Sequence, residues 1–189
     1  MYNEFKVKNS ILFSEVKIIF PDIFNDHRGI IFTDYLESYF INTFENKLRF
    51  GHSKFAQNFQ NVLRGIHGDF KSYKLIQCVY GEIFQVIVDC RKDSETYLKH
   101  ECFNLNHNEP KMILIPPGFG NAFYVKSDFA IYNYKLSYTG EYNDYNKQFT
   151  YKWNDKSINI KWPNKKMIVS KKDKNLLTFK EFKKKFKGI

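Results

Sequence analysis

Short strand-like segments separated by turn residues recur along most of this chain, and they restrict its fold more than any other feature of the sequence. Residues 84–89 alternate in the manner of a β-strand, and an apolar segment, residues 74–79, precedes them. A turn signal, Tyr80–Glu82 with Gly81 at its centre, separates the two segments. This arrangement predicts two strands that pair as a β-hairpin.

Two further strand-like segments surround the prolines and glycines of Pro116–Gly120. The prolines stop strand pairing there, and the glycines permit a tight turn. Another alternating segment, residues 129–138, places four residues on one predicted face: Ala130, Tyr132, Tyr134 and Leu136. Because no long amphipathic helix interrupts these strands, the pattern predicts a mostly β fold, either a sandwich or a closed barrel.

The length and the charge of the chain limit what it can be. At 189 residues it is long enough for one domain with a full core, so we expect residues 1–189 to form a single domain. Ten lysines face one aspartate and one glutamate between Asn164 and Ile189, so segment 164–189 holds about +8 of the formal charge of +10. We interpret this segment as a solvated, basic, partly helical tail, and we expect neither nucleic acid nor a membrane as a partner.

The N-terminus and the cysteines indicate an intracellular setting. Charged residues interrupt every apolar run of residues 1–20, which argues against a signal peptide or a membrane span and predicts a cytoplasmic protein. Cys78, Cys90 and Cys102 are odd in number and form no Cys-x-x-Cys pair. We therefore expect reduced thiols in the core or at the surface.

The segment of residues 61–75 contains the most distinctive chemistry. Arg64 and His67 lie three residues apart, and Lys74 follows after a short polar loop. Histidine is suited to act as a base near neutral pH, and arginine offers a fork of donors that matches phosphate oxygens. Strict alternation would place Arg64 and His67 on opposite faces. Either a bulge at Gly65 re-aims them, or Arg64 lies at the mouth of the site.

Seven segments, taken in order, resemble the signature segments of dTDP-4-dehydrorhamnose 3,5-epimerases and their sugar-nucleotide relatives. They read DHRGI, VLRGIH, KLIQCVYGEIFQVIVDCRKDSETY, IPPGFGNAF, YNYKLS, WNDKSINIKWP and VSKKD, from Asp26 to Asp173. No one of these segments is specific by itself, but seven in the same order are. The resemblance implies a cupin-type jelly-roll barrel, which here ends in the short basic helical tail.

The resemblance also implies a cofactor-independent epimerase that moves protons on carbons next to the ketone of a nucleotide-linked 4-keto sugar. His67 matches the general base of the family, and Asp173 matches the aspartate that pairs with it. Tyr134 matches the acid on the other face of the sugar, and Lys74 matches a lysine whose ammonium group would stabilise the enolate oxygen. A base and an acid that bracket one carbon need no metal ion, flavin or nicotinamide.

Five residues are candidates for substrate binding. Arg64 and Arg28 match arginines that hold the nucleotide diphosphate, and three further candidates complete the set: Gln57, Asn121 and Tyr132. Tyr132 shares a predicted strand face with Tyr134, so either tyrosine could be the acid, and the Tyr-Lys pair favours Tyr134.

The chain departs from the family around the expected pocket. Asn121 stands where the family usually has a histidine, and asparagine cannot exchange protons near neutral pH. The stretches from Gln57 to Arg64 and from His67 to Lys74 are also short. This pattern looks similar to epimerases of GDP-linked 4-keto heptoses in capsule assembly, so we expect a GDP-4-keto-(6-deoxy)heptose, inverted at C3 with C5 left open. The alternative substrate is dTDP-4-dehydro-6-deoxyglucose, inverted at C3 and C5.

Two other functions compete with this interpretation. A metal-dependent cupin enzyme would need clustered histidine and carboxylate ligands, and no His-x-His motif occurs in the sequence. The other is a non-catalytic carbohydrate-binding jelly roll, in which His67 and Tyr134 only line a groove. The family resemblance further implies a homodimer, in which the DHRGI segment reaches the pocket of the neighbouring subunit.

Overall fold

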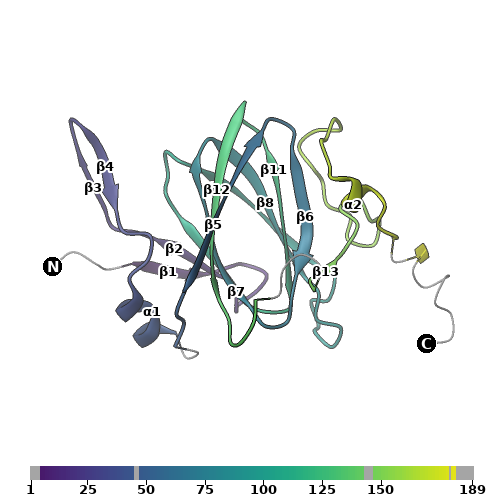
Figure 1. Ribbon diagram of the computed structural model, residues 1–189, viewed down its shortest axis with the longest axis horizontal. Helices are drawn as coiled ribbons and strands as arrows, with labels where there is room; N and C mark the ends of the chain where they lie inside the picture. The colour runs from purple at the N-terminus through teal and green to yellow at the C-terminus, as the bar shows by residue number, and fades with distance from the viewer. Residues whose placement is uncertain (1–4, 45–46, 143–146, 179, 182–189) are drawn as a thin grey trace.

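Two antiparallel β-sheets form the body of the protein, in a computed structural model that describes residues 5–44, 47–142, 147–178 and 180–181 (Figure 1). The six-stranded sheet contains, in spatial order, β1 (Lys6–Asn9), β2 (Lys17–Phe20), β10 (Met112–Ile115), β7 (Tyr73–Tyr80), β12 (Phe129–Ser137) and β5 (His52–Phe59). The five-stranded sheet contains β13 (Phe149–Thr150), β6 (Leu63–Gly68), β11 (Phe119–Val125), β8 (Glu82–Asp89) and β9 (His100–Asn106). A separate ribbon consists of β3 (Ile23–Asp26) and β4 (Gly29–Phe32), and the helices are α1 (Glu37–Thr43) and α2 (Lys171–Lys174).

This architecture is the predicted mostly β fold, a jelly roll of the cupin type. From β5 to β13 successive strands alternate between the two sheets, except that β8 and β9 are neighbours in the five-stranded sheet. Among the described strands, no hydrogen-bonded ladder joins the two sheets. Of the sandwich and the closed barrel that the sequence left open, the structure shows the sandwich.

The predicted hairpin is wrong in its pairing, although both of its strands exist. β7 pairs with β10 and β12, and β8 pairs with β9 and β11, so the two strands lie in different sheets. Gly81 adopts φ +79° at the crossing, and a Cβ atom there would lie 2.2 Å from the Phe129 carbonyl oxygen. The glycine thus marks a tight turn from one sheet to the other.

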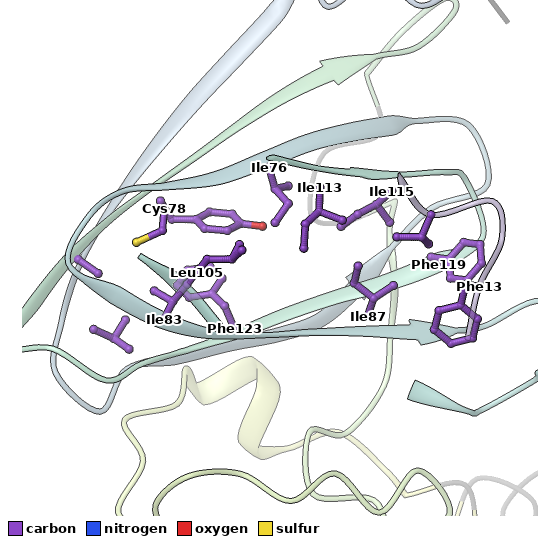
Figure 2. Packing of buried hydrophobic residues seen from close by; sticks show 14 residues of the cluster. Phe13, Ile76, Cys78, Ile83, Ile87, Leu105, Ile113, Ile115, Phe119 and Phe123 are labelled. Atoms are coloured by element: carbon purple, nitrogen blue, oxygen red, sulfur yellow. The ribbon is translucent and has the colours of Figure 1, made fainter. Parts of the chain in front are cut away.

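The main core fills the space between the two sheets (Figure 2). Alternate residues of each strand point into it, as the period of a pleated strand requires. Apolar residues of both sheets meet there, among them Ile76, Ile83, Ile87, Ile113, Ile115, Phe119 and Phe123. Tyr132 belongs to this cluster and stacks on Phe123, with ring centroids 4.2 Å apart.

Smaller cores cover the outer faces of the sheets. Val86 and Val88, on the outer face of β8, pack with Ile158 and with other apolar side chains from residues 149–162. Leu75 of β7 packs on the other side with Phe40 of α1. β7 and β8 are consequently buried on both faces, so the polar residues that alternate in segment 84–89, Gln85 and Asp89, are buried as well.

The β3–β4 ribbon extends as an arm away from the two sheets (Figure 1). Its apolar side chains remain exposed, and Ile31 reaches 70%. At the base of the arm the Asp34 carboxylate accepts hydrogen bonds from Gln77 and Lys135, both on the six-stranded sheet. The arm is thus anchored at its root and uncovered along its length.

The C-terminal segment follows the outside of the five-stranded sheet and ends the described chain. Ser170 caps α2, since its hydroxyl accepts a hydrogen bond of 3.0 Å from the Asp173 backbone N–H. Residue 179 and residues 182–189 of the expected helical tail lie outside the described residues. No helix of the described chain is both long and apolar enough to span a membrane. All three cysteines are free, as predicted, with Cys78 and Cys90 buried and Cys102 exposed.

Candidate active site

A cavity of about 620 Å³ opens between the two sheets and the start of α2. This volume falls within the usual range for small-molecule sites. Seven of the nine sequence-predicted site residues line it: Arg64, His67, Lys74, Asn121, Tyr132, Tyr134 and Asp173.

A β-bulge in β6 explains how Arg64 and His67 reach the same cavity. His67 pairs with Asn121 of β11 and Arg64 pairs with Phe123, so two residues of β6 lie opposite Ala122 alone. A Cβ atom on Gly65 would lie 2.3 Å from the Ala122 side chain, so the close approach of the two strands requires glycine. Of the two explanations left open by the sequence, the structure shows the bulge.

His67 and Asp173 form a hydrogen-bonded pair. The His67 Nε2 atom lies 2.7 Å from Asp173 Oδ1, and the side chains are 32% and 3% exposed. Burial alone would raise the pKa of the Asp173 carboxyl, but the hydrogen bond and charge of His67, with a smaller contribution from Ser170, hold that pKa below its ordinary value. An ionised Asp173 selects the neutral imidazole tautomer with its proton on Nε2 and its lone pair on Nδ1.

Lys74 enters the cavity from β7, in the sheet opposite His67. Its side chain is 7% exposed, and its Nζ atom lies 3.5 Å from the His67 carbonyl oxygen and 3.9 Å from Asp69 Oδ2. Burial lowers the pKa of the ammonium group, and the Asp69 charge opposes that shift. Among the described residues, Asp69 is the one carboxylate within 4 Å of this lysine.

The two tyrosines of β12 have different environments. Tyr132 is 1% exposed, stacks on Phe123 and exchanges hydrogen bonds with the Asn121 amide, at 3.1 and 3.2 Å. Burial strongly raises the pKa of its hydroxyl, despite the Asn121 hydrogen bond. Tyr134 is half-buried and lines the cavity two residues further along the strand.

Arg64 is oriented by a residue that the sequence analysis missed. Asn58 is 2% exposed, and its Oδ1 atom accepts a hydrogen bond of 2.6 Å from Arg64 Nε. This bond leaves the two terminal nitrogens of the guanidinium group to face an anion. Lys54 and Ala56, on the same face of β5, also line the cavity. The alternation of β5 was the available signal for these three residues.

Two predicted binding residues lie away from this cavity. Gln57 is exposed, because it lies between Ala56 and Asn58 and strand alternation turns it to the outer face. Arg28 lies at the tip of the arm, 72% exposed, and its guanidinium group pairs with Asp26 at 2.6 Å. Neither Gln57 nor Arg28 therefore lines the cavity of its own chain, and a role for either residue in substrate binding stays a prediction.

The described residues contain no group of three or more histidine, cysteine, aspartate or glutamate side chains that could hold a metal ion. Outside the pair with Asp173, the described histidines are dispersed. His52 contacts Tyr138 and Tyr142, and His107 stacks on Tyr80.

Comparisons with known proteins agree with this arrangement. The model of the dTDP-4-dehydrorhamnose 3,5-epimerase family matches residues 11–181. Enzymes of that name from Shigella flexneri and Salmonella typhimurium are 36% and 34% identical to the chain, each over 77% of it and over 81% and 80% of their own lengths. A crystal structure of dTDP-6-deoxy-D-glucose-3,5-epimerase from Legionella pneumophila, in complex with dTDP-4-keto-L-rhamnose, superposes with a TM-score of 0.83 at 29% identity over 90% of both chains. The chain therefore belongs to the dTDP-4-dehydrorhamnose 3,5-epimerase family, whose members are isomerases acting on sugar nucleotides.

Proposed function

We propose that the protein inverts C3 and C5 of a dTDP-linked 4-keto-6-deoxy sugar by acid–base catalysis. The observation that carries this proposal is that His67 and Tyr134 line one cavity from opposite sheets. Inversion at a carbon needs a proton removed from one face and returned from the other. Two proton-transferring groups on facing walls supply both steps, and each positioned transfer contributes about 10²–10⁴ in rate.

In this proposal His67 removes the proton next to the ketone. The carbon–hydrogen electron pair moves to form the enolate, and its negative charge develops on the ketone oxygen. The Lys74 ammonium group would stabilise that oxygen in the dry interior of the cavity. Asp173 would stabilise the imidazolium ion formed when His67 accepts the proton. Tyr134 then protonates the other face of the carbon.

The environments of the two tyrosines favour Tyr134 over Tyr132 as the acid. The Tyr132 hydroxyl is already engaged with Asn121, is almost wholly buried and has a pKa far above its ordinary value. Such a hydroxyl gives up its proton poorly. Tyr134 is half-buried and lies at the cavity surface, which suits a group that must reach the sugar.

The nucleotide end of the substrate would contact Arg64, held by Asn58. The comparisons support a dTDP-linked sugar, because the relatives named above are enzymes of dTDP sugars and the Legionella pneumophila structure contains dTDP-4-keto-L-rhamnose. They give no support to the GDP-linked heptose and capsule role expected from the departures in the sequence. The dTDP-linked substrate, first written as the alternative, is therefore the proposal.

The exposed arm supports a homodimer. Arg28 is distant from the cavity of its own chain, yet the arm presents it beside uncovered apolar residues. The outer face of β5 is uncovered as well, with Phe55 67% and Phe59 73% exposed. We propose that the arm docks on a second copy and adds Arg28 to the diphosphate site there. Light scattering should give the mass of a dimer, and a monomer at micromolar concentration would refute the proposal.

The deciding experiment is NMR of reactions in heavy water. Wild-type protein with dTDP-4-dehydro-6-deoxyglucose should incorporate deuterium at C3 and C5 and invert both carbons. Tyr134→Phe should lose inversion more than exchange, because His67 can still return deuterium to its own face. A GDP-linked 4-keto heptose tested in parallel should react more slowly. Binding of dTDP-4-dehydro-6-deoxyglucose without exchange would indicate a carbohydrate-binding module, and deuterium at one carbon alone would limit the reaction to that carbon.

A further inference from the structure

A chain of buried amides extends from the main core to the wall of the cavity. Gln85 of β8 is 0% exposed and lies between Ile83 and Ile87, whose side chains belong to the apolar core. Its Nε2 atom donates to Asn121 Oδ1 at 2.6 Å. Asn121 in turn contacts the Tyr132 hydroxyl. Neither the family resemblance nor the mechanism above assigns a role to Gln85.

The direction of this hydrogen-bond chain follows from its first member. Gln85 Nε2 also donates to the Val86 carbonyl oxygen at 3.0 Å, and a carbonyl oxygen can only accept. The Gln85 group that faces Asn121 is therefore the NH₂ group, and the Asn121 atom that it meets is the oxygen. Because Asn121 Oδ1 also accepts from Tyr132, its acceptor capacity is filled. The Asn121 NH₂ group donates one hydrogen to the Tyr132 hydroxyl, and its second hydrogen can be donated to another acceptor.

We propose that Gln85 is a positioning residue that holds Asn121 as a hydrogen-bond donor to a hydroxyl or carbonyl oxygen of the sugar. Asn121 pairs with His67 across β11 and β6, and side chains of directly opposed strand residues lie about 4.5–5.5 Å apart at Cβ. The donor therefore lies beside the proposed base, near the carbon that reacts. The inference rests on the proposed epimerase function and adds the way in which this pocket recognises the sugar.

Gln85 does not act as an ordinary stabilising core residue. Its Oε1 atom is buried and has no hydrogen-bond partner among the described residues. A buried polar atom in that state destabilises the fold relative to an apolar side chain of similar volume. Methionine at this position should thus leave the protein at least as stable. A residue that served packing alone would not combine unchanged stability with impaired turnover.

The experiment measures turnover, nucleotide binding and stability in two variants, after wild-type turnover of dTDP-4-dehydro-6-deoxyglucose has been established. Gln85→Met should keep the melting temperature at or above that of wild type and lower kcat/KM about 3- to 10-fold, because Asn121 can then present either end of its amide. Asn121→Asp, which replaces the donor by an acceptor, should lower kcat/KM about 10- to 100-fold. Both variants should bind free dTDP with the wild-type Kd, because the contact is to the sugar.

A double-mutant cycle separates positioning through Asn121 from an independent effect. On an Asn121→Leu background, Gln85→Met should change kcat/KM by less than about twofold, because the amide that it orients is gone. An equal loss on both backgrounds, a normal kcat/KM in Gln85→Met, or a parallel loss of dTDP affinity would each overturn the inference while leaving the epimerase function intact. Absence of wild-type turnover would instead remove the proposed function, and this inference with it.

Discussion

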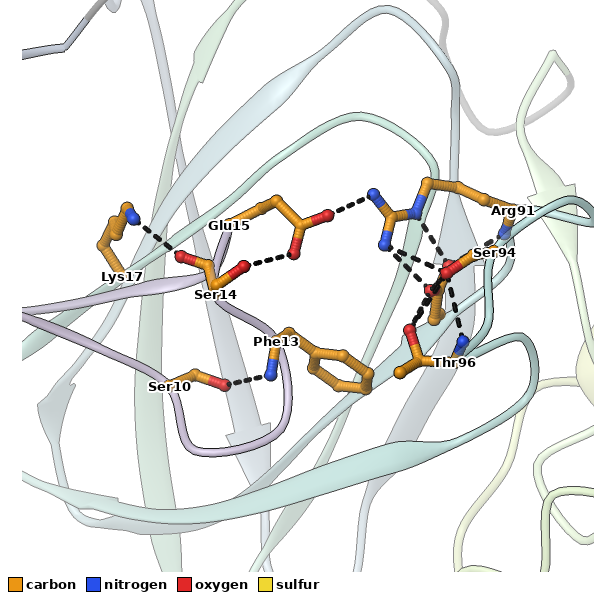
Figure 3. Close-up of polar contacts among 9 residues, drawn as sticks. Ser10, Phe13, Ser14, Glu15, Lys17, Arg91, Ser94 and Thr96 are labelled. Carbon is orange, nitrogen blue, oxygen red and sulfur yellow. Dashed lines mark hydrogen bonds and ion pairs between the residues drawn. The ribbon is translucent and has the colours of Figure 1, made fainter.

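Asp89 and Asp173 are both buried carboxylates, 0% and 2% exposed, yet they lie in very different surroundings. Asp89 accepts hydrogen bonds from the Arg91 guanidinium group and from the Ser94 and Thr96 hydroxyls, within the loop that leaves β8. Arg91 Nη1 also donates a hydrogen bond of 2.7 Å to Glu15 Oε1, and this bond connects the loop to the N-terminal segment (Figure 3). Asp173 instead meets one imidazole at the wall of a cavity.

The contrast distinguishes a structural polar cluster from a candidate catalytic one. Burial opposes ionisation of Asp89, but Arg91, Ser94 and Thr96 outweigh it, so its pKa lies far below the ordinary value. At physiological pH the Arg91 guanidinium group stays charged and the Ser94 and Thr96 hydroxyls stay neutral. This cluster therefore only stabilises the loop. The partner of Asp173 belongs to a residue type that gains and loses a proton near neutral pH, and it is partly exposed to the cavity. A buried carboxylate indicates chemistry when its partner can titrate and can reach a substrate.

The largest effect should come from removing the imidazole of His67 itself. His67→Asn keeps a polar side chain of smaller size at the cavity wall but supplies no base. Turnover and deuterium exchange should fall by about 10²–10⁴, while the melting temperature changes little. Kinetics and thermal unfolding measured on the same preparation test this prediction. Near-normal turnover would show that the His67–Asp173 pair is structural, like the Asp89 cluster.

A smaller loss of activity is expected from Asp173→Asn. The neutral amide can still contact His67, but it neither stabilises the imidazolium ion nor selects one tautomer. A hydrogen bond to a charged group contributes about 1.5–3 kcal/mol, so kcat should fall about 10- to 100-fold. The Kd for dTDP should stay at the wild-type value. A variant with full activity but reduced stability would show that Asp173 resembles Asp89 after all.

The same substitution at Asp89 should act on stability. Asp89→Asn removes a charged acceptor from Arg91, and the unfolding free energy should fall by about 1–3 kcal/mol. The cost is limited because the Arg91 side chain is 31% exposed and keeps its contact with Glu15. A lowered carboxyl pKa contributes stability above about pH 4 that is lost as the pH falls, so the difference from wild type should narrow in acid. Denaturant unfolding at several pH values, with kcat/KM unchanged at neutral pH, checks this.

Sequence reasoning located the strands because alternation and turn residues are local signals. It assigned β7 and β8 to one hairpin, because a turn signal shows where the chain reverses and does not show which strands it pairs with. It selected Gln57, whereas the neighbouring Asn58 is the buried residue that holds Arg64, because a shift of one residue exchanges the two faces of a strand. Gln85 was not selected, because the apolar face of its strand, with Val86 and Val88, suggests that the polar face lies in solvent. Residues 149–162 cover the face of Val86 and Val88, and they come from a distant part of the chain.

The cavity residues divide in a similar way. His67, Lys74 and Tyr134 stand in recognisable local segments, and the structure places all three at the cavity. Asp173 lies 106 residues from His67 in the sequence, so their contact could be expected only from the family resemblance. Asn58 and Asp69 escaped prediction, because their roles depend on which side chains the folded sheets bring beside them.

Asp69 combines a structural contact and a contact with a site residue in one side chain. Its substitution is expected to have the smallest effect of those considered. Its Oδ1 atom accepts backbone hydrogen bonds from Lys71 and Ser72, at 2.9 and 2.6 Å, which shapes the short loop before β7. Its Oδ2 atom makes no hydrogen bond within the described part of the chain and lies 3.9 Å from Lys74 Nζ. Asp69→Asn keeps the loop-forming oxygen and removes the charge, so it separates the two functions.

The expected result of Asp69→Asn is a change in the pH profile. Burial already lowers the pKa of Lys74, and loss of the Asp69 charge should lower it further. Burial raises the pKa of nearby Cys90 to about 12, so that thiol stays neutral and does not replace the lost charge. Because the proposed mechanism needs the ammonium form, activity should fall as the pH rises through the Lys74 pKa, and the alkaline limb of kcat should move to lower pH. Profiles of wild type and Asp69→Asn, with melting temperatures as the control for the loop, test this. An unshifted alkaline limb with a lower melting temperature would make Asp69 a loop residue like Asp89.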